Sequence, residues 1–178
     1  MKAMTVSSNA FTSSLTLLKL PLAIVSLVAL LLTSLQAQAA DPQIFSTKAG
    51  ALRGYDVISY YDIAAGEKPL AGSNAHTVVY KGATFKFANA ENKARFEKNP
   101  DAYIPQYGGY CAYATARDFI TYSRPNAWKI VDGKLYLNNN KASFKGWQKK
   151  QDQYISEADG NWPEVLKHCE KKKRCRKI

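Results

Sequence analysis

The chain reads Trp128-Lys129-Ile130-Val131-Asp132-Gly133-Lys134-Leu135-Tyr136-Leu137 over ten residues that contain its clearest structural signal. Two short runs rich in β-branched, aromatic and aliphatic residues lie on either side of Asp132-Gly133. This dipeptide favours the tight turn in which both central residues have positive φ angles. The stretch therefore predicts a two-stranded antiparallel hairpin.

A second hairpin is predicted upstream of the first. Thr77-Val78-Val79-Tyr80 and Thr84-Phe85-Lys86-Phe87 flank Lys81-Gly82-Ala83, where Gly82 can supply the turn. Phe85 and Phe87 fall on one face of the second strand, as a half-buried strand requires. A further strand is predicted at Val57–Tyr61, because that run is β-branched and aromatic.

Helices are predicted after each hairpin. Asn89 is a good N-cap for a helix to about Lys98, and Asn99-Pro100 ends it. A helical pattern of aromatic and apolar residues runs from about Lys141 until Asp159-Gly160-Asn161. The predicted fold class is α+β, in which the two hairpins and the strand at Val57 form a small antiparallel sheet covered by helices.

The N-terminus has the order of a secretory signal peptide. Lys2 and Lys19 precede an almost wholly apolar run from Leu20 to Leu32, and Ala37-Gln38-Ala39 follows it. We expect cleavage after Ala39, which makes residues 1–39 the signal and places the mature protein in the periplasm or outside the cell. The alternative is a retained anchor in the inner membrane, since the apolar run approaches the length of a short spanning helix.

The charge of the chain is concentrated at its ends. Of the formal net charge of +11, the signal lysines contribute +2 and residues 167–178 contribute +6, which leaves +3 for the body. An electrostatic footprint for nucleic acid should lie across a folded face, so no nucleic-acid partner is expected. After a short N-terminal extension at residues 40–53, residues 54–166 have the size of one domain.

The basic tail at residues 167–178 contains two of the three cysteines. In an oxidising compartment Cys169 and Cys175 could close a small disulfide loop. The run of like charge could contact an anionic envelope surface or serve only to keep the tail solvated. Copper held by His168, Cys169 and Cys175 is a separate option, which the surrounding positive charge would oppose.

The stretch Gln106-Tyr107-Gly108-Gly109-Tyr110-Cys111-Ala112-Tyr113 holds the one cysteine of the body. The paired glycines can adopt backbone angles that other residues resist, so the chain can bend sharply there. Two readings of Cys111 stay open: a site residue presented by this bend, or a small apolar residue that fills the core.

The tyrosines around this cysteine are candidates for a pocket. Tyr107, Tyr110 and Tyr113, together with Tyr55 and Asp56, could line a polar-aromatic cavity, although aromatic residues at this density also build cores. No Cys-x-x-Cys pair, nucleophile elbow or phosphate loop is visible. An enzyme is therefore less favoured than a binding protein.

Several motifs, taken together, closely resemble the exported branch of the YHS domain proteins over about residues 54–166. They are Gly54-Tyr55-Asp56-Val57, residues 82–92, Phe96, Asn99-Pro100, Tyr103, residues 105–112 and residues 132–138. The resemblance implies a YHS-like fold of hairpins packed against two or three helices. It implies no established activity.

The wider YHS superfamily suggests a metal, and this chain departs from its pattern. Ala88 and Asn92 stand where the superfamily's metal-binding cysteines are expected, and neither is a good ligand for a soft ion. The inherited zinc site is therefore expected to be absent. A low-coordinate copper site made by the Cys111 thiolate and the His76 imidazole is the remaining metal hypothesis. The alternative is a small-molecule or protein-interaction module without metal, in which Cys111 is structural.

Overall fold

The computed structural model describes residues 43–167. The predicted signal peptide and the predicted Cys169–Cys175 disulfide lie outside the described residues. No helix within residues 43–167 is long and apolar enough to cross a membrane. The strands are β1 (Ser46–Thr47), β2 (Gly50–Ala51), β3 (Ser73–Tyr80), β4 (Ala83–Phe87), β5 (Arg124–Val131) and β6 (Lys134–Asn138). The α-helices are α2 (Ala90–Lys98), α3 (Pro100–Tyr103), α4 (Ala112–Thr115), α5 (Lys141–Gln148) and α6 (Gln151–Asn161), and the 3₁₀ turns are η1 (Leu52–Gly54), η2 (Ile58–Tyr61) and η3 (Gln106–Gly109).

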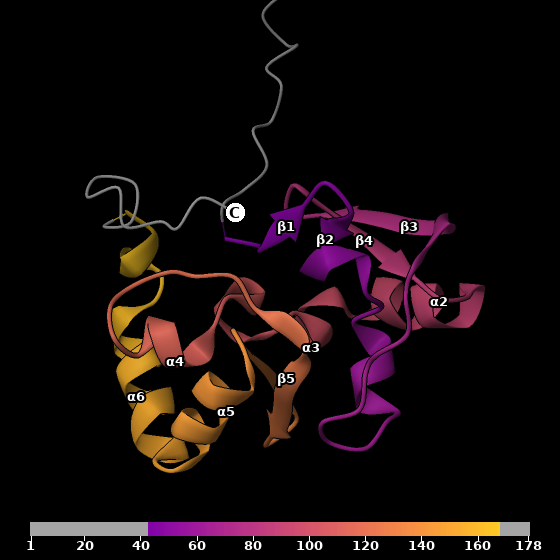
Figure 1. The fold of residues 1–178 in the computed structure, drawn as a ribbon. Helices are drawn as coiled ribbons and strands as arrows, with labels where there is room; N and C mark the ends of the chain where they lie inside the picture. Colours follow the sequence, from indigo (N-terminus) through magenta and orange to yellow (C-terminus); the bar gives the residue numbers. More distant parts are fainter. Residues whose placement is uncertain (1–42, 168–178) are drawn as a thin grey trace, which may run out of the picture. The chain divides into compact units, whose positions relative to one another are not determined.

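The fold is α+β, which confirms the predicted class (Figure 1). The strands pair as three separate antiparallel hairpins, β1–β2, β3–β4 and β5–β6. The expectation that both predicted hairpins share one sheet is therefore wrong. The β3–β4 and β5–β6 hairpins instead contribute buried side chains to one apolar core, to which Phe96 of α2 also belongs.

Both predicted hairpins are present, with two-residue turns. Tyr80 pairs with Ala83 across Lys81-Gly82, and Val131 pairs with Lys134 across Asp132-Gly133. All four turn residues have positive φ angles, between 46° and 74°. These angles match the right-handed twist of the paired strands, and glycine at the second position meets them without strain.

The predicted strand at Val57–Tyr61 is wrong, because the segment forms the 3₁₀ turn η2. The Asp56 side chain explains the difference. Its Oδ1 accepts a hydrogen bond from the Ile58 backbone N–H at 2.9 Å, and the Ser59 hydroxyl donates to the Asp56 carbonyl at 2.7 Å. Such local bonds offer the backbone an alternative to a strand, whatever the β propensity of the residues that follow.

The helix predicted after Asn89 is confirmed as α2. The Asn89 side chain accepts a hydrogen bond from the Asn92 N–H at 2.8 Å, as an N-cap does, and the helix ends at Lys98 before Asn99-Pro100. Phe96 of this helix is fully buried between Phe85 and Phe87 of β4.

The C-terminal helical region is two helices. α5 begins after Asn140, whose side chain accepts from the Ser143 N–H at 2.9 Å, and α6 follows after a break at residues 149–150. Asp159-Gly160-Asn161 was expected to end the helix, yet α6 includes it. The Asn161 side chain donates to the carbonyl oxygens of Thr115 and Ala116 at 2.8 and 3.2 Å, which anchors this last turn on α4.

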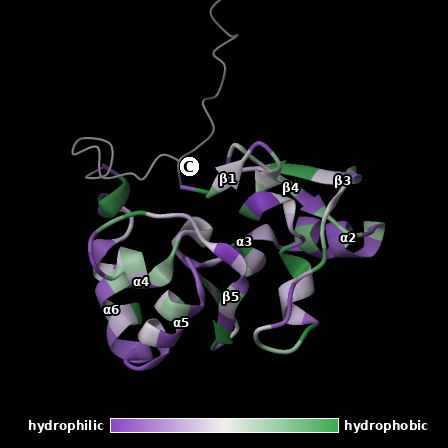
Figure 2. Ribbon diagram, viewed as in Figure 1, coloured by the Kyte–Doolittle hydropathy of each residue, from purple (hydrophilic) through white to green (hydrophobic). Residues whose placement is uncertain are grey.

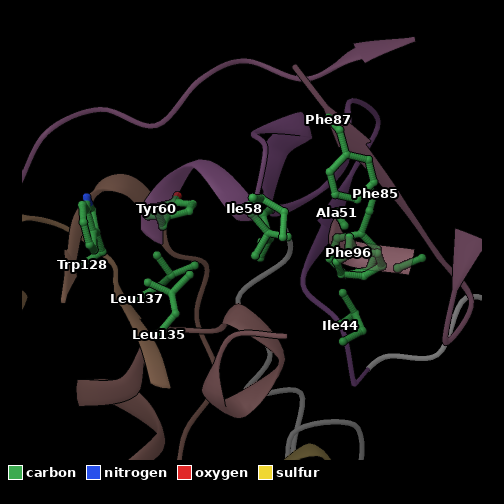
Figure 3. Packing of buried hydrophobic residues seen from close by; sticks show 13 residues of the cluster. Ile44, Ala51, Ile58, Tyr60, Phe85, Phe87, Phe96, Trp128, Leu135 and Leu137 are labelled. Atoms are coloured by element: carbon green, nitrogen blue, oxygen red, sulfur yellow. The ribbon is translucent and has the colours of Figure 1, made fainter. Parts of the chain in front are cut away.

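The main core joins the hairpins. Figure 3 shows Phe85, Phe87 and Phe96 on one side and Tyr60, Trp128, Leu135 and Leu137 on the other, with Ile58 of η2 between them. Residues upstream of the YHS-like motifs also belong to this fold, since four side chains between residues 44 and 52 are buried: Ile44, Phe45, Ala51 and Leu52. A second apolar cluster lies under α4, α5 and α6 around Tyr136 and Trp147.

Candidate functional site

The bend expected at the paired glycines is present as η3. Residues from the start of the domain pack against it. Tyr107, Gly108 and Gly109 have successive φ values of 55°, 60° and 83°. A Cβ on Gly108 would overlap the carbonyl oxygen of Gln43, and a Cβ on Gly109 would overlap the Leu52 side chain. The Gly108 carbonyl also accepts a hydrogen bond from the Phe45 N–H at 2.9 Å. The glycines are therefore required by close packing as well as by backbone angle.

Tyr107 is a non-glycine residue in the left-handed region, which is uncommon and costs conformational energy. Its hydroxyl donates to Asp159 Oδ1 at 2.8 Å and lies 3.2 Å from the carbonyl oxygen of Ile155, both on α6. Burial and the bond to Asp159, in that order, raise the pKa of the Tyr107 hydroxyl above its ordinary value. The phenol stays protonated and keeps its role as a donor at physiological pH.

A pocket of about 290 Å³ opens beside this bend, and Tyr107 is one of its lining residues. We call it the Tyr107 pocket. Its wall includes backbone from η3 and side chains from α3, from the β3–β4 turn and from the end of α6. The lining residues that carry polar or aromatic groups are Gln43, Lys81, Asp101, Gln106, Tyr107, Asp159 and Trp162. This volume lies at the low end of the range for ligand pockets, which suits a molecule of few heavy atoms.

The charged groups of the pocket sum to −1. Lys81 Nζ lies 2.7 Å from Asp101 Oδ1, and this bond is the leading cause of the lowered pKa of Asp101. Asp159 has no cationic partner among the ion pairs formed within residues 43–167 and accepts from Tyr107. The Trp162 ring lies 6.0 Å from the Tyr107 ring, centroid to centroid. The pocket therefore combines an exposed carboxylate with an aromatic side chain.

Cys111 lies on the other side of the same segment and is 1 % exposed. It is the N-cap residue of α4 and forms a parallel β-bridge with Leu137. Its thiol donates to Asn138 Oδ1 at 3.7 Å, and its N–H donates to the Thr121 carbonyl at 3.1 Å. The Asn138 Nδ2 and Thr121 Oγ1 atoms are themselves buried without a hydrogen-bond partner in the part of the chain described.

The surroundings of Cys111 favour the neutral thiol. Burial is the largest influence and raises the pKa of the thiol, while nearby backbone N–H groups and the Arg117 charge act weakly in the opposite direction. A thiolate is the form that attacks electrophiles and binds soft metals. In this environment the thiol behaves as a small packed side chain.

The proposed partner of Cys111 lies in a different hairpin. His76 is half-buried within β3, whereas Cys111 is tied to β6. Within residues 43–167, no group of three or more His, Cys, Asp or Glu side chains is arranged to hold a metal ion.

The predicted pocket tyrosines take different positions. Tyr107 and Tyr110 both pack on Trp162, at ring-centroid distances of 6.0 and 6.2 Å. Tyr113 lies under the Arg117 guanidinium, 3.5 Å from the ring centroid, and is not among the residues that line the Tyr107 pocket. Tyr55 forms a β-bridge with Ala71, and Lys68 Nζ lies 5.5 Å from its ring centroid.

Asp56 is fully buried and binds the two residues, Ala88 and Asn92, that stand where the YHS resemblance places metal-binding cysteines. Its Oδ2 accepts from the Ala88 N–H at 2.8 Å and from Asn92 Nδ2 at 2.7 Å, while Oδ1 accepts from the Ile58 N–H. A carboxylate with three donors is well stabilised without a counter-ion. Hydrogen bonds from Asp56 thus link the start of η2 to the residue that follows β4 and to α2.

Tyr107 is the one lining residue of the Tyr107 pocket that the sequence predicted as a site residue; the others, Asp159, Asp101 and Trp162 among them, were missed. Asp159 lies in a segment whose sequence predicts a helix break, whereas the structure places it within α6, next to Tyr107. Comparisons of the chain with family models, with curated proteins and with solved structures found no match.

Proposed function

We propose that the chain is an exported, non-catalytic binding module of the YHS-like type, and that it takes a small amine-bearing molecule into the Tyr107 pocket. The observation that carries this proposal is the strained Tyr107, whose hydroxyl holds Asp159 at the wall of a pocket with net negative lining. Strained non-glycine residues concentrate at ligand sites, where surrounding packing maintains them.

The chemistry of the lining favours a cation over an anion or an apolar ligand. Asp159 can accept hydrogen bonds from an ammonium group at its second oxygen, since Tyr107 occupies the first. The Trp162 ring can add a cation–π contact. Gln43 and Gln106 offer further hydrogen-bonding groups for a hydroxyl or amide on the same ligand.

The test uses the mature protein with ethanolamine and putrescine as probes. Titration followed by two-dimensional amide NMR should shift the signals of Gln106, Gly108 and Asp159, and Asp159→Asn should weaken binding about tenfold. The control is Asp152→Asn, which removes a carboxylate two turns earlier on α6, outside this pocket. Shifts that are equal in both variants, or that map elsewhere, would refute the assignment.

A soft metal ion held by Cys111, with His76 as its partner, stays a second proposal. Its support is the affinity of thiolates for Cu(I), and the buried, neutral thiol opposes it. Cu(I) titration of the mature protein and of Cys111→Ser separates the two readings. Equal affinity in both proteins assigns Cys111 to packing, whereas loss of a tight site in the variant restores it as a ligand.

A further inference from the structure

A second pocket, of about 440 Å³, has a lining of the opposite charge. It lies between the loop before β3, the start of β5 and the first turn of α5. Three of its lining side chains are cations, Lys68, Arg124 and Lys141, and no carboxylate lines it; the remainder are Gly66, Pro125 and Asn126. We call this the basic pocket.

The charges of the basic pocket are not neutralised by ion pairs within residues 43–167. None of the ion pairs formed within residues 43–167 includes Lys68, Arg124 or Lys141. Two of them lie against aromatic rings instead: Lys68 Nζ lies 5.5 Å from the Tyr55 centroid, and the Arg124 guanidinium lies 5.6 Å from the Tyr122 centroid. Aromatic faces position a cation without neutralising it.

The position of Lys141 is unusual for a helix. It is the first residue of α5, and the first turn of this helix has no acidic residue. The N-terminus of a helix carries partial positive charge, so a lysine there is unfavourable and an anion is favourable. Residues that break a local rule in this way are expected at functional sites.

The loop that carries Lys68 is fixed in place. Trp128 Nε1 donates to the Glu67 carbonyl at 2.8 Å, which ties the loop to β5. The Glu67 carboxylate accepts from the Ala64 N–H at 3.1 Å and does not line the pocket. The basic pocket is therefore framed by connected elements and not by free side chains alone.

Charge in the sequence is segregated around this pocket. Residues 124–150 contain seven lysines and arginines and a single acidic residue, Asp132. All the charged residues in residues 151–166 are acidic. The ribbon around the link from α5 to α6 is hydrophilic in Figure 2, where acidic and basic residues have the same colour. Two of these seven cations, Arg124 and Lys141, line the basic pocket, and a cleft lined by charge of one sign attracts ions of the opposite sign.

We infer that the basic pocket binds a phosphate group carried by a larger molecule. Three cations match a phosphate dianion better than a single carboxylate, and the arginine fork can bond two phosphate oxygens while each lysine acts as a point charge. The Asn126 amide can donate a further hydrogen bond. The volume exceeds that of a bare phosphate ion, so the pocket can hold part of the molecule that bears it. This inference is independent of the Tyr107 pocket, which shares no lining residue with it.

The test compares three probes on the mature protein: inorganic phosphate, glycerol 3-phosphate and vesicles that contain phosphatidylglycerol. Calorimetry or vesicle sedimentation is repeated with Arg124→Gln, Lys141→Gln and the control Lys145→Gln. Lys145 lies one turn after Lys141 on α5 and does not line the pocket. The two pocket variants should weaken binding about tenfold each, and the control should change it less than about twofold.

The probes also identify the source of the phosphate group. Binding of glycerol 3-phosphate indicates a soluble phosphate ester, and binding of the vesicles alone indicates a lipid headgroup. Either result supports the inference if the pocket variants weaken that binding about tenfold and the control does not. Equal losses in all three variants would show diffuse charge attraction and overturn it. Absence of binding by every probe would overturn it as well.

Discussion

Replacing Asp56 by alanine should be among the most destabilising single changes in this domain. The change removes the carboxylate that accepts three hydrogen bonds. The three donors, which are the N–H groups of Ile58 and Ala88 and the side-chain amide of Asn92, then lose their acceptor. Each buried donor left unpaired costs about 1–3 kcal/mol. Because neighbouring groups relax, we expect a loss of about 3–5 kcal/mol in the free energy of unfolding.

The assay is urea unfolding of the mature protein, monitored by tryptophan fluorescence. The matched control is Asp62→Ala, because Asp62 also binds a residue of α2, with its Oδ2 2.7 Å from Arg95 Nη1. Asp62 is exposed and Arg95 partly exposed, so the loss of this pair should cost less than about 1 kcal/mol.

A milder variant keeps the test informative if Asp56→Ala does not fold. Asn92→Ala removes one of the three donors and leaves the carboxylate with two backbone N–H groups, which should cost about 1–2 kcal/mol. If Asp56→Ala and Asp62→Ala lose the same stability, the buried carboxylate does not hold this region together and the reasoning fails.

Three further predictions concern packing and protonation. Gly108→Ala should destabilise the domain more than Gly133→Ala. Both glycines have positive φ, but only the Cβ added at Gly108 would overlap other atoms. Thermal unfolding should show a loss of about 1 kcal/mol in the free energy of unfolding for Gly133→Ala and clearly more for Gly108→Ala. The raised pKa of Cys111 means that stability is complete below the unfolded thiol's pKa of about 8.5 and falls as pH rises above it. Urea midpoints should therefore drop above pH 9 in the wild type and less in Cys111→Ala, and native alkylation should be slow. Arg117→Lys should lose the stacked contact on Tyr113 and cost about 0.5–1 kcal/mol, measured in the same assay.

Local signals explain which elements could be predicted from the sequence. Both hairpin turns and the Asn89-capped helix depend on residues within a few positions of each other, and all three are confirmed. The turn at Ile58–Tyr61 was missed because an Asx-type bond from Asp56 outweighs β propensity, and Asp56 itself is fixed by β4 and α2 from about thirty residues away.

In the candidate site, too, the local feature could be predicted from the sequence and the distant contacts could not. The paired glycines predicted a bend, and the bend is present at Gly108 and Gly109. The identity of its neighbours was not predictable, since Gln43 and Asp159 reach it from opposite ends of the domain. Contacts of such long sequence separation leave no pattern in a single sequence.

The close packing of Gly108 against Gln43 has a practical consequence for the expression of this protein. A recombinant domain designed to begin at Gly54, where the recognisable motifs start, would lack the strand pair β1–β2 and the buried side chains Ile44, Phe45, Ala51 and Leu52. Such a shortened product should be poorly folded and prone to aggregate. Expression should therefore start no later than Gln43, with any purification tag joined through a spacer that does not crowd the bend.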